Sequence, residues 1–187
     1  MNALPASWSR WVARFVRDRR GVSAIEFAFI APILIVFYFG MAETCTLLIA
    51  KRKISHAGAA VADLVSQEKG SVTTSKLSEI KLVGDALVTP MAASALKIQL
   101  SSVTARNPTA GGAPLVDWSF GDGTARAKNS PFSVSTPLNA NESVIVAEVS
   151  YSWTSSIGYF IPNAKNLTHR AELRPRKQNQ IACSNCP

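Results

Sequence analysis

One carboxylate lies inside the most apolar stretch of the chain and needs a chemical explanation. Residues 22–42 read VSAIEFAFIAPILIVFYFGMA, and Glu26 is their only charged residue. Burying a carboxylate in a bilayer costs about 2.5 kcal/mol or more, so it is expected to have a partner or a role. If the chain were cut after Gly21, the new α-amino group on Val22 would lie one helical turn away, about 6 Å along the axis. Alternatively, Glu26 could reach the headgroup layer and need no partner.

The second group with possible chemistry is a pair of cysteines at the C-terminus, Cys183 and Cys186, in the sequence CSNC. A redox-active C-x-x-C pair requires the start of a helix in a thioredoxin-like setting, and a zinc site requires further ligands. Two interpretations remain: a small structural disulfide in an oxidising compartment, or free thiols. We favour the disulfide. The third cysteine, Cys45, is expected to be a buried apolar filler.

The other polar residues do not form a recognisable catalytic pattern. His56 and His169 are the only histidines, and no H-E-x-x-H motif or glycine-rich phosphate loop accompanies them. Asp117 and Asp122 could ligate calcium, yet acids beside a glycine turn are typical of turn chemistry. We therefore predict no catalytic residues, no metal and no cofactor, and we expect that the protein is not an enzyme.

The apolar stretch 22–42 predicts a membrane-spanning helix, with a buried helix of a soluble protein as the alternative. Its 21 residues would span about 32 Å, which matches the hydrocarbon core of a bilayer. Five arginines precede it, whereas only Lys51, Arg52 and Lys53 follow closely, so the N-terminus is expected in the cytoplasm. The predicted organisation is a basic leader at 1–21, a transmembrane helix at 22–50 and an extracytoplasmic domain at 51–187.

The net charge of the chain is concentrated in this leader. The 187 residues carry a formal charge of +8, and residues 1–21 hold five arginines and one aspartate, so half of the charge belongs to them. The remaining positive charge is diffuse and would lie outside the cytoplasm. Nucleic acid is therefore not expected to be a partner.

Beyond the span, the apolar pattern predicts an α+β fold. The first helix is expected to continue to about residue 66, with an apolar stripe of Ile54, Ala57, Val61, Leu64 and Val65. A break at 67–74 precedes a second amphipathic helix, which presents Leu77, Ile80, Val83 and Leu87 and ends by Pro90. Four strand-like segments follow and predict a small antiparallel sheet against the helices: ALKIQLSSVTAR, PLVDWSFGDGT, SVIVAEVSYSW and AELRP.

The residues around position 21 carry a family resemblance. RRGVSAIEF, residues 19–27, resembles the cleavage site of type IV prepilins. More narrowly, RRGVSAIEFAFIAPILIVFYFGMAE resembles the N-terminal segment of TadE-like proteins of tight-adherence (Flp) pilus systems, including Pro32 and a second acid at Glu43. A weaker likeness appears in residues 143–153 and 173–176. Thr44 departs from the family pattern, which has an aromatic residue there.

The resemblance implies a minor pilin or pseudopilin that works by helix packing in the bacterial inner membrane. A prepilin peptidase would cut between Gly21 and Val22, and the close fit of that enzyme to the backbone explains a glycine there. Glu26 would pair with the amine of a neighbouring subunit and set the register of assembly. Pro32 is expected to kink the helix. The implied partners are the membrane, the peptidase, other Tad/Flp pilus subunits and TadE/TadF-like proteins.

Other fates of the leader remain open from the residues alone. Gly40-Met41-Ala42 could serve as a secretory signal-peptide site, and Cys45 fits a lipoprotein site less well. The alternative function is a single-pass periplasmic binding or scaffold protein that is never processed. The two hypotheses differ in whether the mature chain begins at Val22.

Overall fold

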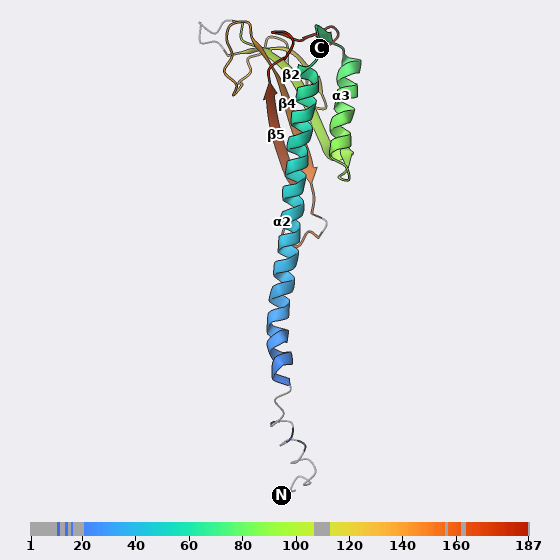
Figure 1. Cartoon of the computed structure of the whole chain (residues 1–187), viewed down its shortest axis with the longest axis vertical. Coiled ribbons are helices and arrows are strands. Elements are labelled where there is room, and N and C mark those ends of the chain that lie inside the picture. The colour runs from blue at the N-terminus through green and yellow to red at the C-terminus, as the bar shows by residue number, and fades with distance from the viewer. Residues whose placement is uncertain are drawn as a thin grey trace. The chain divides into compact units, whose positions relative to one another are not determined.

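The computed structural model describes residues 11, 14, 16, 21–106, 113–155, 157–161 and 164–186 (Figure 1). It confirms the predicted α+β class, with a long helix, a second helix and a four-stranded antiparallel sheet. Most of the predicted leader lies outside the described residues. The elements in chain order are α2 (Val22–Ser66), β1 (Ser71–Val72), α3 (Thr74–Leu87), the 3₁₀ turn η2 (Ala93–Ala95), β2 (Leu96–Thr104), β3 (Leu115–Gly121), β4 (Ser143–Trp153), β5 (Lys165–Leu173) and β6 (Ala182–Cys183).

The chain divides into two compact units, Met1–Thr44 and Cys45–Pro187, and the sheet belongs to the second. Its strand order is β3-β2-β4-β5, with every neighbouring pair antiparallel. Leu100 pairs with Ala147, which pairs in turn with Ala171, so apolar side chains line up across three strands. This alignment fixes the register, because a shift by one residue would turn each side chain to the other face.

Within the second unit, α2 packs its apolar stripe against the sheet. Five residues at helical spacing are at most 1% exposed: Ala50, Ile54, Ala57, Val61 and Val65. Gly58 allows a close approach, since a Cβ there would lie 3.0 Å from Cγ2 of Val149 and 3.2 Å from Cδ2 of His169. The predicted stripe is confirmed except for Leu64, which is only partly buried.

The buried face of α3 differs from the predicted one. Leu77 and Ile80 are buried as expected, but Val83 is 42% exposed and Gly84 is buried in its place. A Cβ on Gly84 would lie 2.5 Å from Cδ1 of Ile98 and 3.0 Å from Cγ2 of Val61, so the helix contacts its neighbours through a bare backbone. Apolar periodicity alone does not reveal such a contact, because glycine carries no side chain to mark it.

Two features at the end of the sheet region also differ from the prediction. The last strand, β5, begins at Lys165 rather than near AELRP. The sequence pattern does not reveal its first half, because His169 interrupts the apolar alternation of Leu167, Ala171 and Leu173. In addition, β1 and β6 form a two-residue parallel pair, Ser71 with Ala182 and Val72 with Cys183. Strands of two residues are too short for a periodic pattern to predict.

Asp117 and Asp122, the acids beside the glycine turn, have local partners. Oδ2 of Asp122 accepts a hydrogen bond from the backbone N–H of Ile98 at 3.0 Å, and its other oxygen pairs with Lys81. Asp117 accepts hydrogen bonds from Thr104 and from Arg106, the latter at 2.8 Å. Among the residues that the structure describes, no three His, Cys, Asp or Glu side chains lie close enough to hold a metal ion.

Gly121, the last residue of β3, occupies a position where only glycine fits. Its φ is +148°, and an added Cβ would lie 2.1 Å from the backbone oxygen of Ile98, which cannot move aside. We expect Gly121→Ala to lower the free energy of unfolding by about 3 kcal/mol. The matched control is Gly70→Ala, where φ is +77° and the space is open, so only backbone strain of about 1 kcal/mol is added. Denaturant unfolding of the detergent-solubilised chain, followed by circular dichroism, measures both; equal stabilities of the two variants would contradict this account.

On the sheet face opposite the helices, Glu172 of β5 holds the segment 133–136 in place. Its Oε2 accepts hydrogen bonds from the backbone N–H groups of Ser135 at 2.9 Å and Thr136 at 2.8 Å, and Oε1 pairs with Arg170 at 2.8 Å. Burial raises the pKa of Glu172, but the hydrogen bonds from Ser135 and Thr136, together with Arg170, outweigh it. The net result is a pKa below the ordinary value of 4.5.

This shift predicts a specific loss of stability in acid. Because the folded pKa of Glu172 is lowered, its contribution is present above pH 4.5 and is lost as the pH falls through the folded pKa. Below about pH 4.5 the unfolding free energy of Glu172→Gln should therefore fall less steeply with decreasing pH than that of the wild type. The difference in slope should correspond to the uptake of up to about one proton. Denaturant titrations at several pH values measure this slope. A wild-type slope in Glu172→Gln would refute the prediction.

Candidate membrane anchor and processing site

The part of α2 that belongs to the first unit, residues 22–44, exposes apolar side chains around its whole circumference. All seven residues from Ile33 to Phe39 are large and apolar, with exposures from 43% to 69%. Successive helical residues are 100° apart, so seven of them leave no polar face. The protein itself buries none of the apolar 18-residue window, unlike the core helix of a soluble protein, which is mostly buried. Among the described residues, α2 is the one helix long and apolar enough to cross a membrane, and it is consistent with a single membrane anchor.

One polar side chain of this segment, that of Thr44, is accommodated by the helix itself. The Thr44 hydroxyl donates to the carbonyl oxygen of Gly40 at 2.9 Å, which removes the cost of an unpaired donor in an apolar setting. Pro32 lies within α2, and the helix is continuous on both sides of it. Pro32 cannot donate to the carbonyl of Ala28, so a kink at this point remains a prediction.

Gly21 immediately precedes α2, and nothing in the fold demands a glycine there. A Cβ on Gly21 would have no described atom within 4 Å, apart from its chain neighbours, and its φ is not in the left-handed region. Val22, the first residue of α2, is 49% exposed. The peptide bond between them is thus accessible, and any need for glycine must come from a molecule that binds this segment.

Glu26 lies one helical turn after Val22 on the same side of α2, and it is exposed. In the uncut chain the nitrogen of Val22 is an uncharged peptide nitrogen. An ion pair between Glu26 and this nitrogen is therefore possible only after cleavage. The spacing of the two residues on the helix would allow such a pair within one chain.

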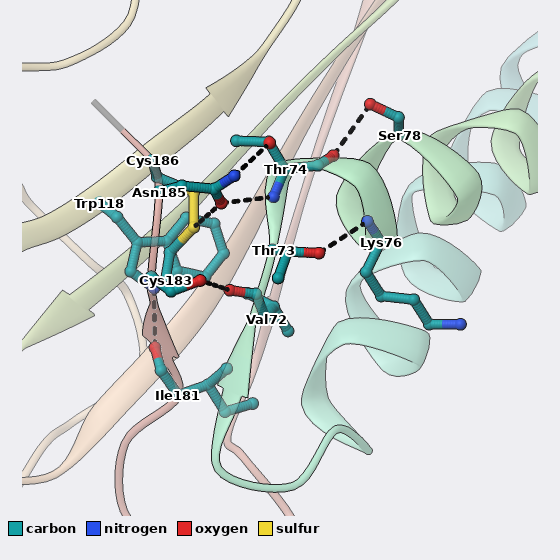
Figure 2. Close-up of a disulfide and its surroundings, with 11 residues drawn as sticks. Val72, Thr73, Thr74, Lys76, Ser78, Trp118, Ile181, Cys183, Asn185 and Cys186 are labelled. Atoms are coloured by element: carbon teal, nitrogen blue, oxygen red, sulfur yellow. Dashed lines mark hydrogen bonds between the residues drawn. A yellow bond between two sulfur atoms is a disulfide. The ribbon is translucent and has the colours of Figure 1, made fainter.

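The C-terminal cysteines are joined in a disulfide between Cys183 and Cys186, whose Cα atoms are 5.5 Å apart (Figure 2). The expectation for Cys45 is wrong: its side chain is exposed. Cys45 precedes the buried Ala50 by five residues, which places it about 140° around the helix from the face that packs on the sheet.

The disulfide belongs to a C-terminal segment that ties the sheet to the helices, as Figure 2 shows. The indole N–H of Trp118 donates to the carbonyl oxygen of Ile181 at 2.7 Å. The backbone N–H of Ser184 donates to Val72 at 3.1 Å, and Oδ1 of Asn185 accepts from the backbone N–H of Thr74 at 2.9 Å. The sequence contained no periodic signal for these contacts, because they depend on single polar residues far apart in the chain.

Comparison with known families locates one match. The family model for TadE-like protein matches residues 21–63, which begin at the exposed glycine and cover most of α2. No curated protein and no solved structure matches the chain. The chain therefore carries a TadE-like domain at residues 21–63.

Proposed function

We propose that the protein is a TadE-like minor pilin or pseudopilin that acts in the assembly of Flp (type IVb) adhesive pili through the Tad secretion system. The observation that carries this proposal is the match of residues 21–63 to the TadE-like family, together with the apolar circumference of the same helix. The family resemblance supplies the pilus system, and the exposed helix supplies a reason for membrane attachment. We assign it a structural role, without catalysis and without a cofactor.

The proposed topology follows from the charges beside the span. Residues 1–21 form the basic leader in the cytoplasm, residues 22–50 cross the inner membrane once, and residues 51–187 form the periplasmic domain. A disulfide between Cys183 and Cys186 suits an oxidising compartment and so supports this orientation. The Lys51-Arg52-Lys53 cluster would meet the headgroups on the periplasmic side.

The proposed cleavage by prepilin peptidase prepares the chain for assembly. Cutting between Gly21 and Val22 removes the leader and creates a positively charged amine next to an apolar helix. A carboxylate in the bilayer is tolerated when it has a partner of opposite charge. Glu26 of one subunit would pair with the amine of the next, which fixes the axial offset between neighbouring helices. Prepilin peptidase, Tad/Flp pilus subunits and TadE/TadF-like proteins are the proposed partners.

The proposal is tested by removing the protein from a piliated strain. We expect a deletion strain to lose Flp fibres in electron micrographs and adherence in a surface-binding assay, and the wild-type chain supplied in trans to restore both. Wild-type fibre numbers and adherence in the deletion strain would argue against the proposal. They would favour the anchored scaffold protein, for which an intact leader is expected.

A further inference from the structure

The loop between β4 and β5 exposes apolar side chains where a soluble domain would carry polar ones. Of its described residues, Ile157 is 47% exposed, Tyr159 78% and Phe160 40%. The rings of Tyr159 and Phe160 pack edge to face, with centroids 5.2 Å apart. Three large apolar side chains exposed within four residues indicate a surface that contacts something other than water.

Two contacts establish the direction of β5 relative to α2 in the second unit. Oγ of Ser55 lies 3.3 Å from Nδ1 of His169 in β5. At the end of α2, the carbonyl oxygen of Ser66 accepts a hydrogen bond at 2.9 Å from the backbone N–H of Arg176, three residues after β5 ends. The two elements therefore run in the same direction.

The height of the loop along α2 follows from these contacts. Trp153 pairs with Lys165 at the end of the β4–β5 ladder, four residues before His169. Four residues of strand extend about 13 Å, which equals about nine residues of helix. The base of the loop therefore lies level with residues near 46 on α2.

The helix at this level is also apolar and exposed. Leu48 and Ile49 are each 54% exposed, and the exposed bases Lys51 and Arg52 follow them. Lys165 at the base of the loop is exposed as well. We call these residues, with the three exposed apolar residues of the loop, the juxtamembrane patch: Leu48, Ile49, Lys51, Arg52, Ile157, Tyr159, Phe160 and Lys165.

We propose that the juxtamembrane patch binds the periplasmic surface of the membrane, with the loop aromatics in the headgroup layer and the bases against anionic lipid phosphates. This inference rests on the proposed membrane anchoring of α2. Tyr and other aromatic residues favour this layer, and Lys and Arg are attracted to anionic lipids at about 1 kcal/mol each. The occupant is lipid rather than a soluble partner, because the patch lies level with the point where the predicted span ends. The loop would hold the domain on the bilayer before the subunit is extracted.

The test uses the full-length chain with Cys45→Ser, so that one introduced cysteine carries an NBD fluorophore while the disulfide remains. The label is placed by Phe160→Cys, and by Ile157→Cys as a second site in the same loop. Lys69→Cys, an exposed position beyond the far end of α2, is the aqueous control, and Phe37→Cys reports insertion of the span. The protein is reconstituted in vesicles of phosphatidylethanolamine and phosphatidylglycerol.

We expect lipids with a nitroxide near the headgroup to quench the labels at 160 and 157, and iodide to quench them severalfold less than the label at 69. Vesicles of phosphatidylcholine alone should reduce the difference. The inference would be overturned if iodide quenched the label at 160 as strongly as the label at 69. It would also be overturned if neither iodide nor the nitroxide lipids quenched the label at 160, because such shielding indicates a contact with protein. If lipids shield the label at 37 but not the label at 160, the membrane contact of the patch is refuted and the anchoring of α2 is retained. If iodide also reaches the label at 37, the proposed anchoring of α2 is refuted as well.

Discussion

Gly21→Trp is expected to leave the precursor uncut in the membrane. An enzyme that must align the peptide bond after residue 21 has to accommodate the side chain at that position. A misplacement of about 1 Å at a reacting bond can lower the rate about 100-fold. Because Gly21 is exposed and no described neighbour lies near its Cβ position, the substitution should not disturb the chain itself. Immunoblots of membrane fractions should show a single larger species, longer by the 21-residue leader.

The control for this experiment distinguishes the competing cleavage sites. Ala42→Trp alters the residue at which an ordinary signal peptidase would cut. We expect the Ala42 variant to be processed like the wild type. If Ala42→Trp blocks processing and Gly21→Trp does not, the cut lies after the apolar segment and the prepilin assignment is wrong.

Glu26→Ala is expected to retain insertion and to lose assembly. Removing the carboxylate makes the segment about 2.5 kcal/mol or more easier to insert, so the protein should remain in the membrane fraction. The same change removes the proposed partner of the amine on Val22. A loss of 1.4 kcal/mol at each subunit contact is already tenfold in affinity. We therefore expect fibres per cell to fall about tenfold or more in electron micrographs.

Two further variants separate charge from shape at this position. Glu26→Gln keeps the size and the hydrogen-bonding ability but not the charge, and it should fail like Glu26→Ala. Glu79→Gln removes an exposed acid from α3 and should assemble normally. Normal piliation by Glu26→Gln would mean that the charge does not set the register, and that the carboxylate merely reaches the headgroups.

The sequence predicted the fold where structure depends on local periodicity. The single helix from the apolar span to Ser66, the approximate limits of α3 and three of the four strands follow from repeating apolar patterns. The errors arise where a tertiary contact overrides the pattern. Gly84 rather than Val83 faces the core, because the close approach of α3 to α2 and β2 needs a bare backbone. The first half of β5 was not predicted, because His169 interrupts its apolar row.

The candidate site was predicted from a motif rather than from a three-dimensional arrangement. Residues 21–63 lie in one continuous segment, so their spacing is readable along the chain. In contrast, the contacts of the C-terminal segment join residues more than sixty positions apart, such as Trp118 with Ile181. The juxtamembrane patch likewise combines α2 with the β4–β5 loop. No pattern along the chain could bring these residues together before the sheet was known.

The most direct test of the account is the intact mass of the protein extracted from membranes of cells that produce it, supported by N-terminal sequencing. We predict a detergent-dependent chain that begins at Val22, with Cys183 and Cys186 unreactive toward thiol reagents until reduced. A mature chain that still begins at Met1, or one that begins after Ala42, would contradict the central claim that cleavage exposes an amine beside Glu26.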